Sequence, residues 1–133
     1  MALNPFISSP AARAAADAVC ALCNGGTIKV YSGTQPANAD AAVAGTLLVT
    51  LGFSATAFGA STGAGVATAN AITAANAVAS ATATWFRAYK SDGTTAVFDG
   101  SVGTSAADLV LSSVALTSGG NVAVSSLTYT QTL

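Results

Sequence analysis

Two cysteines three residues apart are the most conspicuous chemical feature of this 133-residue chain. Cys20 and Cys23 form a Cys-x-x-Cys pair, a spacing used by structural zinc sites and by dithiol redox centres. A zinc site needs four ligands, and the chain has no other cysteine and no histidine. A redox centre needs a lowered thiol pKa, whereas both thiols fall in the last turn of a predicted helix, whose partial negative charge disfavours thiolate. We therefore interpret the pair as small residues of an alanine-rich helix.

Three aspartates of the second half, Asp92, Asp99 and Asp108, are candidate calcium ligands because Ca²⁺ prefers carboxylate oxygens. Their spacing contains no Asp-x-Asp run, and Asp92 and Asp99 each precede a glycine. Turn formation explains them better, so we expect no metal site.

The glycine-rich segment from Gly59 to Gly65 has the density of a phosphate-binding loop, but no Lys-Ser or Lys-Thr follows it. Glycine at this density is typical of turns between strands, and we interpret the segment as such a turn.

A serine or threonine nucleophile would need a base, and without histidine the candidates are Lys29, Lys90 or an aspartate. Neither Gly-x-Ser-x-Gly nor Ser-x-x-Lys is present, and Ser91 and Ser101 lie in glycine-containing turns. We expect no enzymatic activity, no catalytic residue and no cofactor.

The densest aromatic cluster is Trp85, Phe86 and Tyr89, with Arg87 between them. Such a cluster is either a platform for a sugar ring or part of the core. The chain has few aromatic residues, 7% of its length, so we expect at least two of the three in the core.

Composition excludes several functions. The chain has 4 Lys+Arg and 5 Asp+Glu, a net charge of −1, and cations that form no run, so we expect neither nucleic-acid binding nor attraction to an anionic membrane. The hydrophobic content of 52% comes largely from alanine. Serine, threonine, asparagine and glycine interrupt every apolar stretch well before the roughly 18 residues of a membrane span. The first residues, Met-Ala-Leu-Asn-Pro-Phe, lack the pattern of a secretory signal, which predicts synthesis in the cytoplasm.

A helix is predicted from about Pro10 to Cys23, with Ser9 as its N-cap and Asn24-Gly25-Gly26 as its stop. At 100° per residue, one face carries only small or aliphatic side chains and the other is polar. The predicted apolar face consists of Ala11, Ala15, Ala18, Val19 and Leu22. The predicted polar face consists of Arg13, Asp17, Cys20 and Asn24.

After Gly26 the hydrophobic period changes from 3.6 to 2, which predicts strands. Strict alternation also favours a strand in the stretch from Gly65 to Lys90, where alanine occupies every odd position from 75 to 83 and two threonines lead into residues 85–89. The other expected strands lie at 27–31, 46–54, 95–98, 108–113 and 122–131, with Asp99-Gly100 ending the third of these or forming a bulge in it.

These patterns predict an all-β fold, an antiparallel, jelly-roll-like β-sandwich with one short N-terminal α-helix. We divide the chain into an N-terminal arm and helix, residues 1–24, and a β-sandwich domain, residues 25–133. We expect residues 1–24 to be an assembly element outside the sandwich core. The alternative is that Val19 and Leu22 close an open end of the sandwich within the same chain.

Several motifs together resemble those of a family of small structural proteins of tailed bacteriophages, the capsid cement or decoration proteins. The resemblance is carried by residues 12–19, 26–36, 47–51, 57–59, 65–72, 84–87 and 98–104. It covers most of the chain but consists of fold and turn motifs, so it implies no active-site residue. Cys20 and Cys23 depart from the family pattern.

The resemblance implies a virion protein that binds the outer surface of the lattice of the major capsid protein and stabilises the head. The expected partners are the major capsid protein and further copies of the chain, as a dimer or trimer. Two alternatives are a phage tail or tip component that binds a glycan or receptor through the Trp85 cluster, and a small adhesin or pilin subunit. The absent signal sequence disfavours the last.

Overall fold

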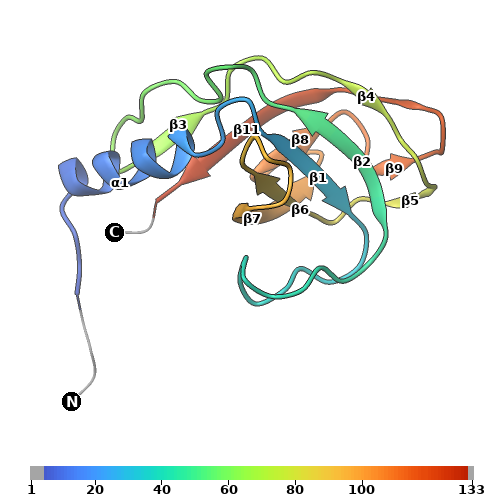
Figure 1. Cartoon of the computed structure of the whole chain (residues 1–133), viewed down its shortest axis with the longest axis horizontal. Coiled ribbons are helices and arrows are strands. Elements are labelled where there is room, and N and C mark those ends of the chain that lie inside the picture. Colours follow the sequence, from blue (N-terminus) through green and yellow to red (C-terminus); the bar gives the residue numbers. More distant parts are fainter. Residues whose placement is uncertain (1–4, 132–133) are drawn as a thin grey trace.

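The computed structural model describes residues 5–131 (Figure 1). The chain forms an all-β sandwich with one short helix at its N-terminal end, as predicted. In chain order the elements are α1 (Ser9–Ala21), β1 (Thr27–Tyr31), β2 (Leu47–Gly52), β3 (Val66–Thr68), β4 (Ala75–Asn76), β5 (Ala81–Thr82), β6 (Trp85–Tyr89), β7 (Ala96–Gly103), β8 (Leu109–Leu111), β9 (Ala115–Leu116), β10 (Asn121–Val122) and β11 (Val124–Thr130).

Helix α1 begins one residue earlier than predicted. Ser8, not Ser9, is the N-cap, because its backbone is extended and its hydroxyl accepts a hydrogen bond from the Ala11 N–H at 3.3 Å. The helix ends at Ala21, so Cys23 lies just beyond it.

The buried face of α1 also differs from the predicted one. Ala12, Ala16 and Cys20 face the sandwich and are almost fully buried, whereas Leu22 is 47% exposed. Cys20 and Cys23 belong to the main apolar cluster, so the inner side of the helix is part of the core, contrary to expectation. The helix contacts β3 and β11 (Figure 1). Whether residues 1–24 also act in assembly stays a prediction.

Seven strands form one curled sheet in the order β2-β1-β6-β7-β8-β11-β3. One pair departs from the predicted antiparallel arrangement, because β7 and β8 run parallel, with Val102 beside Leu109. The five residues between these strands reverse the chain twice, and Ala106 adopts a positive φ of 50° there. Three hydrogen bonds between Ser101 and Asp108 close this connection. Ser101 donates both its N–H and its hydroxyl to the carboxylate, and Asp108 donates its N–H to the Ser101 hydroxyl.

The two edges of the sheet are joined by the segment that follows β3. Thr73 donates its N–H to the Gly52 carbonyl at 2.8 Å, and Val78 donates to the Leu48 carbonyl at 2.7 Å. The chain that leaves β3 at one edge therefore covers the outer edge of β2, which would otherwise be an unpaired strand edge.

The alternating alanines form two short strands rather than the single predicted one. The odd positions from Ala75 to Ala83 turn inward and the even positions are exposed, as alternation requires. The pairing partner changes halfway, because β4 pairs with β10 and β5 pairs with β9. Residues 77–80 bend between these two partner strands. The alternation of alanine therefore predicted which side chains turn inward, but it did not predict that the strand is interrupted between β4 and β5.

β7 continues through Asp99-Gly100, where the sequence predicted an end or a bulge. Gly100 is buried against Phe86, and a Cβ on Gly100 would lie 2.5 Å from the Phe86 ring. Glycine is needed there for close packing inside the strand rather than for a turn. β9 had no prediction, whereas the predicted strand of residues 65–90 is divided among β3, β4, β5 and β6.

Candidate functional site

The two cysteine thiols are inaccessible. Cys20 and Cys23 are free and buried, and burial raises the pKa of Cys20 to about 11 and that of Cys23 to about 12. A redox dithiol needs the opposite shift. Within residues 5–131, no three His, Cys, Asp or Glu side chains lie close enough together to hold a metal ion.

The glycine-rich segment is a turn that holds the helix. Asp17 accepts a hydrogen bond from the Ser61 N–H at 2.8 Å, and Arg13 donates to the Gly63 carbonyl at 2.6 Å. The Ser61 hydroxyl donates to the Arg13 carbonyl at 3.0 Å. The bond from Ser61 lowers the pKa of Asp17. Both charges of the helix are thus engaged with the 61–63 turn.

The structure does not gather the three candidate aspartates into one site. Asp92 caps the turn after β6 by accepting from the N–H groups of Thr94 and Thr95. Asp108 closes the connection between β7 and β8, as described above. Asp99 is paired with Arg87 in a nearly buried ion pair, with Nε and Oδ1 2.6 Å apart.

The aromatic cluster is buried, so it offers no platform to a sugar ring. Trp85 and Phe86 are fully buried, and Tyr89 is nearly so. Trp85 stacks on Tyr31 with ring centroids 4.6 Å apart and donates its indole N–H to the Ser32 carbonyl. All three residues are therefore buried, which confirms the prediction that at least two of them belong to the core.

Arg87 holds the loop that covers this face of the sheet. Its guanidinium lies 5.6 Å from the Trp85 ring centre and donates to the carbonyls of Ala41 and Asn38. Lys29, the candidate base, lies over the Tyr89 ring at 4.8 Å. This arrangement fixes the long 32–46 loop onto the sheet.

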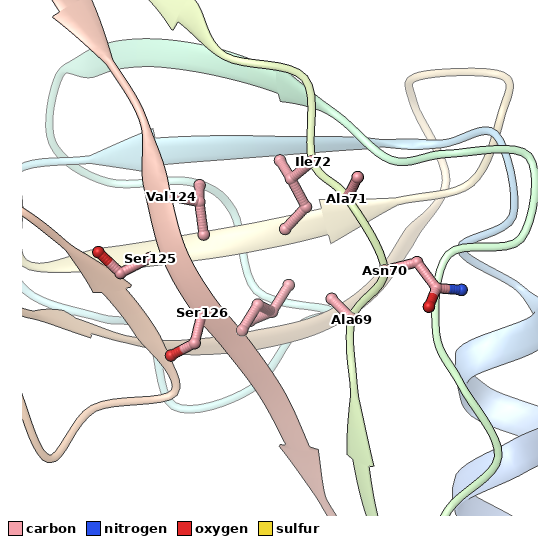
Figure 2. A pocket seen from close by; sticks show the side chains of 8 residues that line it. Ala69, Asn70, Ala71, Ile72, Val124, Ser125 and Ser126 are labelled. Carbon is pink, nitrogen blue, oxygen red and sulfur yellow. The ribbon is translucent and has the colours of Figure 1, made fainter.

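The concave features of the molecule are small. A cleft of about 170 Å³ lies between the segment after β3 and the start of β11, where these two segments of the chain diverge (Figure 2). Ile72 and Val124 point toward the gap, and Asn70 and Ser125 lie at its rim. A second cleft, of about 210 Å³, lies beside Cys20. The first cleft is lined by no titratable side chain, so it shows no means of acid-base chemistry.

The most unusual surface lies at the N-terminal end. We define the outer helix face as Ala11, Ala14, Ala18, Ala21 and Leu22, all of which are exposed. The segment before the helix leads away from the body of the molecule (Figure 1) and carries Phe6 at 78% exposure and Ile7 at 39%. The predicted apolar face of the helix contained Ala11, Ala18 and Leu22, whereas no pattern in the sequence predicted that Phe6 and Ile7 belong to this surface.

Comparison of the chain with protein-family models, with curated proteins and with solved structures found no match. Within residues 5–131, the single helix is too short to cross a membrane.

Proposed function

We propose that this protein is a capsid cement or decoration protein of a tailed bacteriophage, which binds the outer surface of the major capsid protein lattice and stabilises the head. The exposed apolar surface at the N-terminal end is the observation that carries the proposal. A monomer in solution rarely leaves a helix face and large side chains such as Phe6 and Leu22 uncovered together.

The charge content supports an assembled protein. Only 7% of the residues are charged, against about 25% in an average soluble domain. Several of these few charges are bonded within the chain, as in the nearly buried Arg87 and Asp99 pair and the surface contact of Asp17 with Ser61. A surface made of alanine, serine and threonine is suited to contact with other protein surfaces, because little charge must lose its water.

The proposed partner, the major capsid protein, is supported by the sequence resemblance to cement proteins. A cement protein needs no chemistry, because a ligand that binds only the assembled lattice stabilises it by RT ln(1 + [L]/Kd) per site, about 2.7 kcal/mol when its concentration is 100 times Kd. Contacts that bridge neighbouring capsomers further oppose their separation.

The test is the position and copy number of the protein in the virion. Cryo-electron microscopy should place it on the outside of the head, and quantitative mass spectrometry should give a copy number that approaches that of the major capsid protein. Particles without the protein should open at a lower temperature than complete ones. A few copies per particle, or density at the tail alone, would overturn the proposal and favour the tail or tip alternative.

A further inference from the structure

The sheet carries a second buried part of the core on its outer face. Trp85, Tyr31 and Tyr89 are at most 7% exposed, yet they lie outside the main apolar cluster. Their neighbours Phe86 and Val30, whose side chains point to the opposite side of the sheet, belong to that cluster. A small separate cluster of this kind normally lies beneath a long loop. Here that loop is the segment between β1 and β2, which runs below the sheet in Figure 1.

One arginine holds the middle of this loop, residues 34–44, which we call the strap. Arg87 donates to the Ala41 carbonyl at 2.8 Å and to the Asn38 carbonyl at 3.3 Å. Within residues 5–131, these two are the only hydrogen bonds that join the strap to the rest of the chain. Apolar burial adds little, because Val43, the largest aliphatic side chain of the strap, is 40% exposed. The strap is therefore attached to the sheet at one polar contact.

The strap begins and ends at a narrow neck. Ser32 donates its N–H to the Thr46 carbonyl at 3.1 Å, and Thr46 donates its N–H to the Ser32 hydroxyl at 3.2 Å. The next residues inward, Gly33 and Gly45, have positive φ values of 88° and 91°. Glycine can change these angles without the steric cost of a Cβ. The neck thus holds the two ends of the loop together, while the two glycines allow the strap to move as a unit.

We propose that the strap is a hinged cover, which swings about Gly33 and Gly45 and uncovers the outer-face cluster while the main apolar cluster stays intact. The closed state is the one in Figure 1. In the open state, Arg87 loses its two bonds to the strap but keeps its ion pair with Asp99, and the Trp85 ring becomes accessible to solvent. Because one small polar contact separates the two states, we expect an open population of about 0.1–10%. This inference does not rest on the proposed function.

Trp85 reports on the state of the strap, because it is the only tryptophan of the chain. It is fully buried, and its ring centre lies 5.6 Å from the Arg87 guanidinium that holds the strap. A buried indole is shielded from acrylamide, a small neutral quencher of fluorescence, whereas an uncovered indole is quenched. Quenching at urea concentrations below the unfolding transition therefore measures opening of the strap separately from global unfolding.

The first test weakens the contact with Arg87 from the exposed side. The Asn38 side-chain oxygen accepts hydrogen bonds from the N–H groups of Asp40 and Ala41, both at 3.0 Å, and so shapes the turn that presents two carbonyls to Arg87. Asn38→Ala removes this oxygen, so the open fraction should rise by about tenfold, since two hydrogen bonds are lost. Asn38→Asp keeps a side-chain oxygen and is the matched control. Asn38 is exposed, so both variants should fold.

The second test obstructs closure at the hinge. A Cβ on Gly45 would lie 1.9 Å from the Ser32 carbonyl oxygen, so Gly45→Ala is incompatible with the closed strap and should increase the quenching of Trp85. Gly119→Ala is the matched control. Gly119 has a similar φ of 85°, but its Cβ would meet nothing within 4 Å. Both variants carry the same kind of backbone strain, and only Gly45→Ala affects the strap.

The inference predicts more quenching of Trp85 in Asn38→Ala and Gly45→Ala than in their controls, with urea unfolding still cooperative. It is overturned if Asn38→Ala is quenched no more than Asn38→Asp. A folded Gly45→Ala that is quenched like Gly119→Ala also overturns it, because the strap would then not swing at this glycine. Should Gly45→Ala fail to fold, the two Asn38 variants decide alone.

Discussion

Arg87 and Asp99 lie opposite each other on β6 and β7 and form a two-pronged ion pair, with Nε and Oδ1 2.6 Å apart and Nη2 and Oδ2 2.9 Å apart. Their side chains are 5% and 4% exposed. Because Arg87 also donates to the carbonyls of Asn38 and Ala41, one guanidinium joins the sheet to the loop that covers it.

Asp99→Asn should therefore lower the free energy of unfolding by about 3–5 kcal/mol, because it leaves a buried arginine without its counter-charge. The double variant Arg87→Met, Asp99→Leu should recover most of this loss, since it removes both charges. Urea denaturation measures both. Amide hydrogen exchange at residues 38–41 should be faster in the double variant than in the wild type. Equal exchange would show that the loop does not depend on Arg87.

Gly100→Ala should destabilise the protein by about 1–3 kcal/mol, because the new methyl group would overlap the Phe86 ring inside the core. Gly59→Ala is the matched control, since its nearest neighbour would be an ordinary 3.8 Å away. Thermal unfolding of the two variants should differ clearly. Similar melting temperatures would mean that β6 and β7 yield easily at this point.

The inner face of the helix can be checked by enlarging one alanine on each side. Ala16→Met should cost about 1–3 kcal/mol, because Ala16 is fully buried. Ala11→Met should change stability by less than about 0.5 kcal/mol, because Ala11 is exposed. Chemical denaturation at low protein concentration gives both values, and the reverse order would restore the face that the sequence predicted.

Acid should weaken the turn after β6. Hydrogen bonds from the Thr95 side chain and from the N–H groups of Thr95 and Thr94 lower the pKa of Asp92 from 3.8 to about 2. A lowered folded pKa adds stability above pH 3.8, and this contribution disappears as the pH falls to about 2. In Asp92→Asn the amide oxygen can still accept from the backbone, but stability should depend less on pH in this interval. Identical pH profiles of unfolding would contradict this assignment.

The native thiols should react slowly. Cys20 and Cys23 are buried and their pKa values are raised to about 11 and about 12, so little thiolate exists at pH 8. A colorimetric disulfide reagent should label them only after denaturation. Thr104→Cys adds an exposed thiol that should react at once in the native protein. Equally fast labelling of the native thiols would instead support a redox role.

Local patterns in the sequence predicted those parts of the fold that depend on neighbours in the chain. The strand at Thr27–Tyr31 follows from alternation and lies where it was expected. The inward side of the alanines from 75 to 83 also follows, because alternate side chains of any extended segment point to opposite sides. The N-terminal helix, the one helix within residues 5–131, was predictable for the same reason.

Contacts between distant segments decided the rest. The parallel pairing of β7 with β8 and the change of partner between β4 and β5 depend on which strand lies opposite, which a single-strand pattern does not encode. A contact between distant segments also decided that the Trp85 cluster is part of the core and not a sugar platform. Trp85 donates its indole N–H to the carbonyl of Ser32, which lies 53 residues earlier in the chain.

Residue types and their spacing predict that the N-terminal segment is a helix with apolar alanine faces, whereas contacts with distant segments set which face turns inward. Alanine occurs on both sides of α1, so hydrophobic periodicity discriminates poorly between them. The choice is made by Asp17 and Arg13, which bond to Ser61 and Gly63, residues 44 and 50 positions away. These bonds fix the rotation of the helix, bury Cys20 and leave Ala18 and Leu22 outside, because they form only when the 61–63 turn lies beside the helix in the folded chain.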